Sequence, residues 1–172
     1  MRTTWFQLKY RRFLLRCEST AQIGRAVIVA SHGVAKSVSI GDRVTICDGV
    51  VLETGVHGKI IIAEDVWISR FSVISAQKLI VIERGALVGE FCSIRDANHG
   101  IALNNVPIRQ QPFDVAPVTI GEDCWIGRGV AVLKGATVGE GAVIGANAVV
   151  SRDIPPNAIA VGIPAVVARY RS

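Results

Sequence analysis

The segment 95–113, RDANHGIALNNVPIRQQPF, contains the side chains best suited to chemistry. It holds one of the three histidines of the chain, His99, together with Asp96 and Asn98. The unperturbed pKa of an imidazole lies near neutrality, so His99 can accept a proton from a hydroxyl group that attacks a carbonyl carbon. A nearby carboxylate or amide can orient the imidazole or bind hydroxyl groups of a substrate. The segment therefore offers His99 as a candidate general base, with Asp96 and Asn98 as candidate partners, and the alternative is a surface histidine at a loop boundary.

A six-residue repeat surrounds this segment and stops within it. Each hexapeptide begins with an aliphatic residue, and its fifth residue is usually small. The fifteen hexapeptide starts are Ile40, Ile46, Leu52, Ile62, Ile68, Ile74, Ile82, Val88, Ile94, Ile120, Ile126, Val132, Val138, Ile144 and Val150. One large and one small inward residue in every six describe a short strand followed by a sharp corner. Three such strands make a triangular coil, and coils stacked about 4.8 Å apart form a parallel β-solenoid.

The composition agrees with many short strands joined by tight turns. Of the 172 residues, 50% are hydrophobic, only 6% are aromatic, and 17 are glycines. This length suits one domain with a substantial core. No apolar stretch reaches the roughly eighteen residues that a membrane span requires, and the basic N-terminus lacks the apolar core of a secretory signal. We therefore expect a cytoplasmic protein.

The net charge of +5 is located entirely at the N-terminus. Five basic residues precede the first acidic residue, Glu18, and the remaining 14 basic and 14 acidic residues cancel. A nucleic-acid-binding protein usually carries basic residues on its folded body too, so this distribution argues against nucleic acid. In a helix, one stripe would contain Phe6, Tyr10, Phe13, Leu14 and Cys17. Residues 1–17 then either cap the open end of the solenoid or contact the inner face of a membrane, and both can hold together; the third alternative is a disordered segment.

The cysteines and histidines do not form a metal-binding pattern. Cys92 and Cys124 occupy small fifth positions of the repeat and Cys47 occupies a second position, which predicts that they pack in the core. The cysteines show neither a CxxC pair nor zinc spacing, and the three histidines are widely separated. We predict no metal site. Asn98 also falls in a small fifth position.

Residues 117–165 combine the repeat with the motifs WIG, GANAVVSRDIPPN and GIPA. With these motifs the chain resembles the hexapeptide-repeat acyltransferases. It is most similar to the maltose, galactoside and nodulation-factor acetyltransferases and to the O-acetyltransferases of bacterial polysaccharides. The resemblance implies a left-handed parallel β-helix, acetyl-CoA as co-substrate without a metal, and a homotrimer with active sites between subunits. The N-terminal helical region of the maltose and galactoside enzymes is not recognisable here, which favours the polysaccharide branch.

The same resemblance implies roles for individual residues. A histidine beside an excursion loop is the catalytic base in this family, and His99 holds that place. The oxyanion donor follows the WIG motif, at the backbone N–H of Arg128. Contacts to coenzyme A are implied at Trp125, Arg128, Ala146, Ser151, Arg152 and Arg169. Gly127 and Gly145 would allow the pantetheine arm to approach the backbone closely. Val166 departs from relatives that carry a basic residue there.

Two further features of the loop region leave alternatives open. The loop carries Arg109, Gln110, Gln111 and Phe113, which face either a sugar acceptor or a neighbouring subunit. His57 holds the same place in its coil as His99 does. We therefore expect the two histidines along one edge, two coils and roughly 10 Å apart. His57 is either an acceptor contact or a plain surface residue.

We expect three parts: a basic amphipathic segment over 1–20, a β-helix acyltransferase domain over 21–160 with an excursion loop at 100–117, and a C-terminal tail over 161–172. The expected reaction transfers the acetyl group of acetyl-CoA to a sugar hydroxyl in the synthesis of surface polysaccharide or another glycan. His99 acts as the general base in direct attack. The open alternatives are an amino-sugar, serine or antibiotic acceptor, and a non-catalytic solenoid scaffold.

Overall fold

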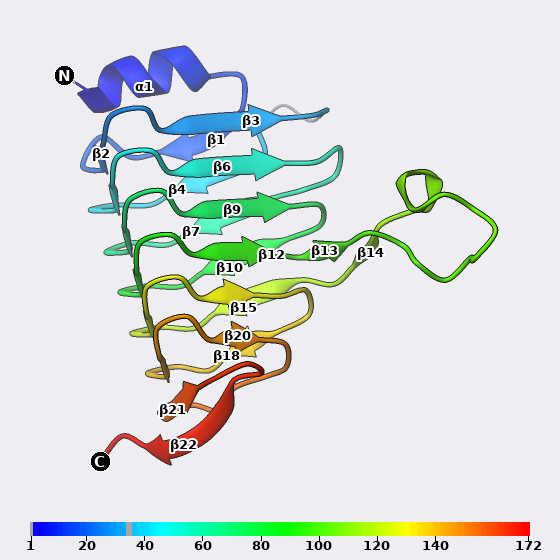
Figure 1. The fold of residues 1–172 in the computed structure, drawn as a ribbon. Coiled ribbons are helices and arrows are strands. Elements are labelled where there is room, and N and C mark those ends of the chain that lie inside the picture. The colour runs from blue at the N-terminus through cyan, green and yellow to red at the C-terminus, as the bar shows by residue number, and fades with distance from the viewer. Residues whose placement is uncertain (1, 34–35) are drawn as a thin grey trace.

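The chain winds into a parallel β-solenoid with a helix at one end and a long arm at its side (Figure 1). The structure is a computed structural model that describes residues 2–33 and 36–172, so Met1, Val34 and Ala35 lie outside it. As the chain descends from the N-terminus in Figure 1, the front strands run to the right and the rear strands run to the left. This winding is left-handed, and the predicted left-handed parallel β-helix is confirmed.

Three sheets, here called A, B and C, form the three faces of the solenoid. Sheet A contains β1 (Leu14–Cys17), β4 (Val38–Ile40), β7 (Ile60–Ile62), β10 (Ile80–Ile82), β15 (Val118–Ile120) and β18 (Thr137–Val138). Sheet B contains β2 (Gln22–Ile23), β5 (Thr45–Ile46), β8 (Trp67–Ile68), β11 (Leu87–Val88), β16 (Trp125–Ile126), β19 (Val143–Ile144), β21 (Ala158–Val161) and β22 (Val166–Tyr170). Sheet C contains β3 (Ile28–Ser31), β6 (Val51–Thr54), β9 (Val73–Ala76), β12 (Ser93–Arg95), β17 (Ala131–Val132) and β20 (Val149–Val150).

The aliphatic residues of the repeat form continuous columns inside the solenoid. All fifteen predicted hexapeptide starts are buried, with a relative exposure of 1% or less. Ile62, for example, pairs in parallel register with Ile40 in one neighbouring coil and with Ile82 in the other. Each column residue therefore packs on its equivalent in the next coil, as the repeat predicts.

The corners that follow sheet C vary most in length from coil to coil, and we call this edge corner CA. It comprises residues 55–59, 77–79, 96–117, 133–136 and 151–153. The three fifth-position residues that are exposed, Val56, Lys78 and Asn98, all lie in it. Asn98 falls in a fifth position of the repeat but is exposed, because the chain leaves the coil at Ala97 to form the arm. The opposite edge of sheet C, which we call corner BC, comprises residues 24–27, 47–50, 69–72, 89–92, 127–130 and 145–148.

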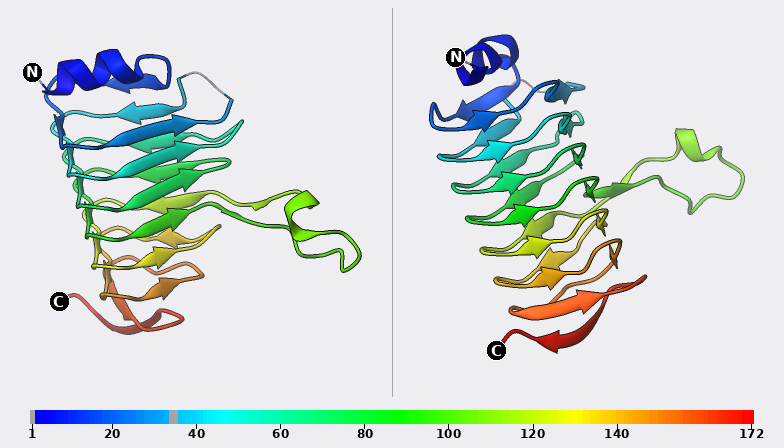
Figure 2. Two further views of the ribbon diagram at one scale, coloured as in Figure 1. Left: turned by 45° about the horizontal axis from the view of Figure 1, so that its top comes forward. Right: turned by 60° about the vertical axis from the view of Figure 1, so that its left-hand side comes forward.

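The helix α1 (Arg2–Tyr10) covers the N-terminal end of the solenoid (Figure 2). Phe6 and Tyr10 are buried against the first coil, and the Tyr10 hydroxyl donates a hydrogen bond to the carbonyl oxygen of Val27 at 3.1 Å. The predicted capping role of the helix is supported by this packing. Its predicted stripe does not continue to Cys17, because Leu14–Cys17 form β1 and pair with β4 instead. The described residues include no helix long and apolar enough to cross a membrane.

The four cysteines are free thiols. Cys92 and Cys124 are buried in the core, as the repeat predicts, whereas Cys47 is only half-buried. Burial raises the pKa of the Cys124 thiol to about 11, so this thiol stays protonated at neutral pH.

Ile61 and Ile62 test the column directly, because they are neighbours in β7 with opposite orientations. Ile62 has a relative exposure of 1%, and Ile61 has one of 41%. We expect Ile62→Ala to lower the free energy of unfolding by about 2–5 kcal/mol, since it leaves a cavity in a closed column. The matched control Ile61→Ala removes the same atoms from the surface and should cost less than about half as much. Urea unfolding followed by circular dichroism measures both, and equal losses would contradict the column.

Candidate active site

A long arm leaves the solenoid at corner CA, between β12 and β15 (Figure 1). Its base is an antiparallel pair of β13 (Ala97–Asn98) and β14 (Asp114–Val115), and its outer part holds the 3₁₀ helix η1 (Ile108–Gln110). An ion pair of 2.9 Å joins Asp114 to Lys134 in the following coil. The predicted excursion at 100–117 is present, but the chain leaves the coil earlier, at Ala97.

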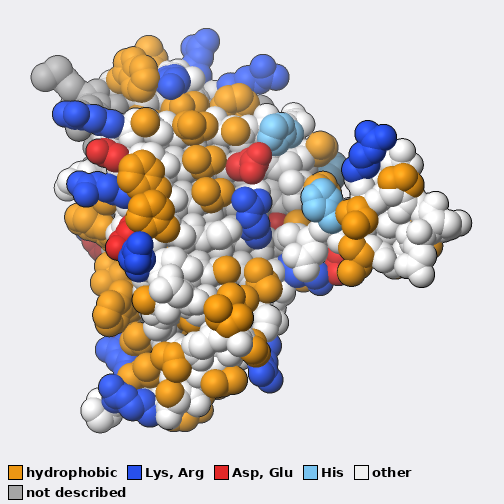
Figure 3. Space-filling model, in the orientation of Figure 1, with side chains coloured by type: hydrophobic (Ala, Val, Ile, Leu, Met, Phe, Trp, Pro, Cys, Tyr) orange, Lys and Arg blue, Asp and Glu red, His pale blue; other side chains and the backbone are white. Residues whose placement is uncertain are grey.

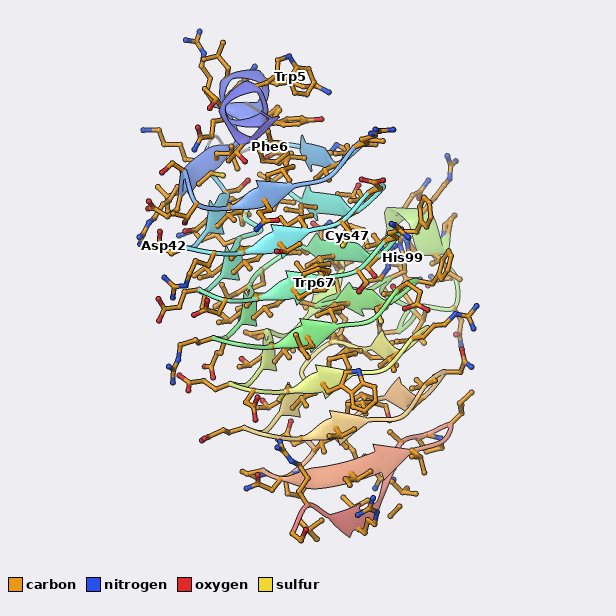
Figure 4. All side chains as sticks on the ribbon, turned by 90° about the vertical axis from the view of Figure 1, so that its left-hand side faces the viewer. Trp5, Phe6, Asp42, Cys47, Trp67 and His99 are labelled. Carbon is orange, nitrogen blue, oxygen red and sulfur yellow. The ribbon has the colours of Figure 1, made fainter. Side chains whose placement is uncertain are left out.

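His99 directly follows β13, where the arm leaves the body (Figure 4). It is exposed, and the centroid of its ring lies 4.8 Å from that of Phe113, with the planes tilted by 41°. Phe113 directly precedes β14, so both sides of the arm hold the imidazole in place. An exposed imidazole that is restrained by a neighbouring ring can exchange a proton with a bound substrate.

Asp96 is fully buried and anchors the base of the arm. Its carboxylate accepts hydrogen bonds from the backbone N–H groups of Gln77, Lys78 and Leu79, at 2.6, 2.7 and 2.6 Å. Within the described residues, its carboxylate makes no hydrogen bond to His99. The geometry gives Asp96 a structural role, in which it ties the arm to the turn of the preceding coil.

Two amide side chains of the arm have different surroundings. Asn98 is exposed and pairs through its backbone with Asp114. Gln111 points into the arm, where its amide accepts a hydrogen bond from the Leu103 N–H and donates to the carbonyl oxygens of Leu103 and Val106, at 2.9–3.0 Å. Gln111 therefore stabilises the fold of the arm. Its side-chain amide is used within the arm, so neither of the two alternatives that the sequence left open, a sugar acceptor or a neighbouring subunit, applies to it.

The residues implied to bind coenzyme A divide between two edges of the solenoid. Trp125 lies on the outer face of β16, and Arg128 and Ala146 lie in corner BC. Ser151 and Arg152 lie in corner CA, on the same edge as the arm. In these coils the strands of sheet C, β17 and β20, have two residues each and separate the edges by roughly 10 Å. One chain alone therefore does not bring the predicted residues together. Arg169 lies apart from both edges, in β22, where it pairs with β21.

Gly127 and Gly145 are required by the stacking of coils. A Cβ at Gly127 would lie 2.6 Å from the carbonyl oxygen of Ile144, and a Cβ at Gly145 would lie 2.7 Å from Cγ1 of Val161. Both added atoms would meet the next coil rather than an outside ligand. The close approach of a ligand, which we expected from the sequence, is therefore not needed to explain these glycines.

Arg128 has both a charged side chain and an available backbone donor. Its guanidinium lies 3.4 Å from the Glu90 carboxylate and 5.6 Å from the centre of the Phe91 ring. In residues 2–33 and 36–172, the backbone N–H of Arg128 donates no hydrogen bond. Phe91 stacks on Phe71 at 5.5 Å, and these rings line a groove of about 470 Å³ with Trp67. Corner BC thus combines a free N–H donor, a cation and an aromatic surface.

A polar network on the outer face of sheet C was missed by the sequence analysis. Nε2 of His32 lies 3.0 Å from one carboxylate oxygen of Glu53, and the Ser75 hydroxyl donates to the other at 3.0 Å. The hydrogen bond with His32 holds the pKa of the Glu53 carboxyl below its usual value. Arg95 lies in register with Ser75, four residues before His99. The sequence does carry a pattern that could have revealed this network: a polar residue, Glu53, Ser75 or Arg95, directly follows the hexapeptide start in three successive coils.

Comparison with known proteins agrees with this geometry. The family model for the bacterial transferase hexapeptide, six repeats, matches residues 117–152. The chain is 33% identical to a probable acetyltransferase of Mycobacterium tuberculosis over 98% of its own length, and it spans 59% of that relative. It is 30% identical to the putative lipopolysaccharide biosynthesis O-acetyl transferase WbbJ of Escherichia coli, covering 78% of this chain and 72% of WbbJ.

A solved structure of the N-acyltransferase AntD of Bacillus cereus, a point mutant with coenzyme A and dTDP-4-amino-4,6-dideoxyglucose, has the same fold. The TM-score is 0.76 at 20% identity, and the match covers 98% of this chain and 89% of AntD. Solenoid, arm and repeat together define the class of hexapeptide-repeat β-helix proteins. The similarity to WbbJ shows that this chain belongs to the hexapeptide-repeat transferase family.

The anchoring role of Asp96 predicts a loss of stability in Asp96→Asn. Since an amide offers one acceptor oxygen where a carboxylate binds three N–H groups, we expect a loss of about 1–3 kcal/mol. The matched control is Asp114→Asn, because Asp114 is an exposed acid at the same arm base and its ion pair contributes little. Thermal unfolding compares the two variants. If Asp96→Asn were no less stable than the control, the anchoring role would be refuted.

Proposed function

We propose that this protein is an O-acetyltransferase that moves the acetyl group of acetyl-CoA to a sugar hydroxyl in the synthesis of surface polysaccharide or another glycan. The observation that carries the proposal is the exposed imidazole of His99, held by Phe113 at the base of the arm in a hexapeptide-repeat transferase. The resemblance to WbbJ, a putative lipopolysaccharide biosynthesis O-acetyl transferase, supports a sugar hydroxyl as the acceptor.

The chemistry needs a base, an oxyanion donor and a leaving thiol. His99 takes the proton of the acceptor hydroxyl as its oxygen attacks the thioester carbonyl. The backbone N–H of Arg128 donates to the oxyanion that forms. The C–S bond then breaks, the ester remains on the sugar, and the proton held by His99 passes to the departing thiolate of coenzyme A. No covalent intermediate with the protein is required.

Coenzyme A lies along the C-terminal coils in this proposal, and a pocket at Arg152 is suited to its nucleotide end. The pocket has a volume of about 350 Å³, and its walls include Pro155, Ala165 and Val166. Apolar walls suit a nucleotide base, and the exposed guanidinium of Arg152 suits a phosphate group. Coenzyme A in AntD, which shares the fold, supports this donor. Val166 fits the same pocket as an apolar wall, where some relatives carry a basic residue.

The division of the site between two edges supports a homotrimer. In a closed ring of three copies, corner CA of one chain faces corner BC of the next, which brings His99 close to Trp125 and Arg128 of a neighbour. The arm also exposes the apolar side chains of Ile101 and Ile108, which a neighbouring subunit would cover. An active site between subunits follows from the same arrangement.

The acceptor then approaches from the N-terminal side of His99, because coenzyme A occupies the C-terminal coils. The outer face of sheet C carries the His32–Glu53–Ser75 network and Arg95 on that side. Each Glu53 oxygen uses one hydrogen bond within the network and can accept another. A pair of adjacent sugar hydroxyls matches this acceptor geometry. We therefore assign Glu53 to binding of the acceptor sugar.

The first experiment is calorimetric titration of acetyl-CoA into protein shown by sedimentation to be trimeric. We expect about one site per chain. His99→Ala should keep this affinity while lowering the rate of thiol release with sugar acceptors by about 10²–10⁴-fold, since a general base contributes that much. His57→Ala is the matched control, as His57 is an exposed histidine at the same edge, and its turnover number should be unchanged.

No binding of acetyl-CoA to the folded trimer would refute the transferase proposal and favour a non-catalytic scaffold. Binding without transfer to sugars, but with transfer to an amino sugar, serine or an antibiotic, would retain the donor site and change the acceptor. An unchanged rate in His99→Ala would remove His99 from the mechanism.

The role of Glu53 predicts a separate effect on the acceptor. For the sugar used best by the wild type, Glu53→Gln should raise KM about tenfold or more, since a hydrogen bond to a charged group contributes about 1.5–3 kcal/mol. The turnover number and acetyl-CoA affinity should stay the same. Glu64→Gln is the matched control, because Glu64 is an exposed, ion-paired carboxylate on another corner. If KM rose equally in both variants, Glu53 would have no specific role.

A further inference from the structure

The capping helix has a second, outward-facing side that capping does not explain. Phe6 and Tyr10 face the first coil and are buried, whereas Trp5 and Leu8 face outward with relative exposures of 63% and 73%. Figure 4 shows Trp5 and Phe6 on different sides of the helix. Leu15 of β1 adds a third exposed apolar side chain to the same end of the solenoid. Only the inner side of α1 is needed to cover the coil.

Basic side chains surround these apolar residues. The ammonium of Lys9 lies 5.0 Å from the centre of the Trp5 ring, and Arg11 and Arg12 are exposed where the helix ends. Arg16 pairs with Glu18, but Arg11 and Arg12 take part in no ion pair within the described residues. In Figure 3 blue side chains gather at this end of the molecule. The entire net charge of +5 belongs to the first sixteen residues of the sequence.

We infer that the α1 end of the solenoid binds the surface of an anionic lipid membrane, with Trp5 and Leu8 in the interface and Arg11 and Arg12 near the lipid headgroups. Apolar and basic side chains on one exposed surface are the combination that interfacial helices use. Each basic residue near an anionic leaflet contributes about 1 kcal/mol, which corresponds to about fivefold in affinity. This inference does not depend on the chemistry proposed for His99.

Two other occupants fit this surface less well. A second copy docked end to end would bring two positively charged segments together, which repel each other. Nucleic acid would engage the cations but would leave Leu8 and Leu15 without a suitable partner. A membrane surface accommodates both kinds of side chain. In a trimer with parallel solenoids the three α1 ends point the same way, so three weak contacts would act together.

The test is co-sedimentation of the full chain with vesicles of phosphatidylcholine containing about 30% phosphatidylglycerol, and with vesicles of phosphatidylcholine alone. We expect binding to the anionic vesicles that weakens as salt is raised, and little binding to the neutral ones. Arg11→Gln with Arg12→Gln should lower the partition coefficient by about 30-fold, at about fivefold for each charge. Trp5→Ala with Leu8→Ala should lower it by about tenfold or more, because it removes the apolar contact.

The matched control is Arg43→Gln with Arg84→Gln, which removes the same charge from two equally exposed arginines on the corner between sheets A and B. Its vesicle binding should equal that of the wild type. Thermal unfolding and acetyl-CoA titration show whether each variant is folded, and α1 tolerates alanine well. A loss in one of these readouts would concern the fold or the donor site, not the membrane contact.

Four outcomes would overturn the inference. The wild type stays in the supernatant with anionic vesicles at low salt. The arginine control loses as much binding as the Arg11 and Arg12 variant. The Trp5 and Leu8 variant binds as well as the wild type, which would leave a purely electrostatic contact. Duplex DNA retains the protein while vesicles do not, which would make this end a polyanion site.

Discussion

The stacking of equivalent residues in successive coils is the constraint on which the rest of this structure depends. Each aliphatic residue in a column is held by the same kind of residue above and below, and the backbone ladder repeats at about 4.8 Å. A coil therefore cannot change its inward side chains without disturbing both neighbours. Side chains can vary from coil to coil mainly on the outer faces and at the corners. Corner CA is the edge where the chain adds residues, and it is there that the arm and His99 are found.

Residues inside the columns were predicted well because their period reports directly on their orientation. Residues at corner CA were predicted less well, because added residues shift the register without breaking the aliphatic pattern in the next strand. Asn98, for example, falls in a fifth position of the repeat, where most residues are buried, and is exposed. Hydrogen bonds across coils, such as those of Asp96 with residues 77–79 or of His32 with Glu53, join residues about twenty positions apart. The repeat does not specify such pairs, since it constrains only the aliphatic and small positions.

The triangular cross-section also explains why one chain holds only half of the proposed site. The arm leaves sheet C at corner CA. The N–H donor of Arg128 lies at the opposite edge of that sheet, in corner BC, and Trp125 lies just before that corner, in β16 of sheet B. The interior between the edges is filled by the columns, so no pocket inside the solenoid can join them. Joining them requires a second copy whose other edge faces the arm. The division of the proposed site and the proposed trimer thus follow from the same filled interior.

The position of the arm along the solenoid relates the two proposals to each other. Three coil spacings, roughly 14 Å, separate β3 in the first coil from β12, which leads into the arm. The helix adds about 10 Å, its own diameter. With the α1 end on a membrane, the proposed base His99 would stand roughly 25 Å above the lipid headgroups. The His32–Glu53–Ser75 network lies between them. A glycan attached to the membrane would therefore meet this network on the outer face of sheet C before it reaches His99. The sugar presented to His99 would then be several sugar units away from the lipid, rather than the sugar next to the anchor.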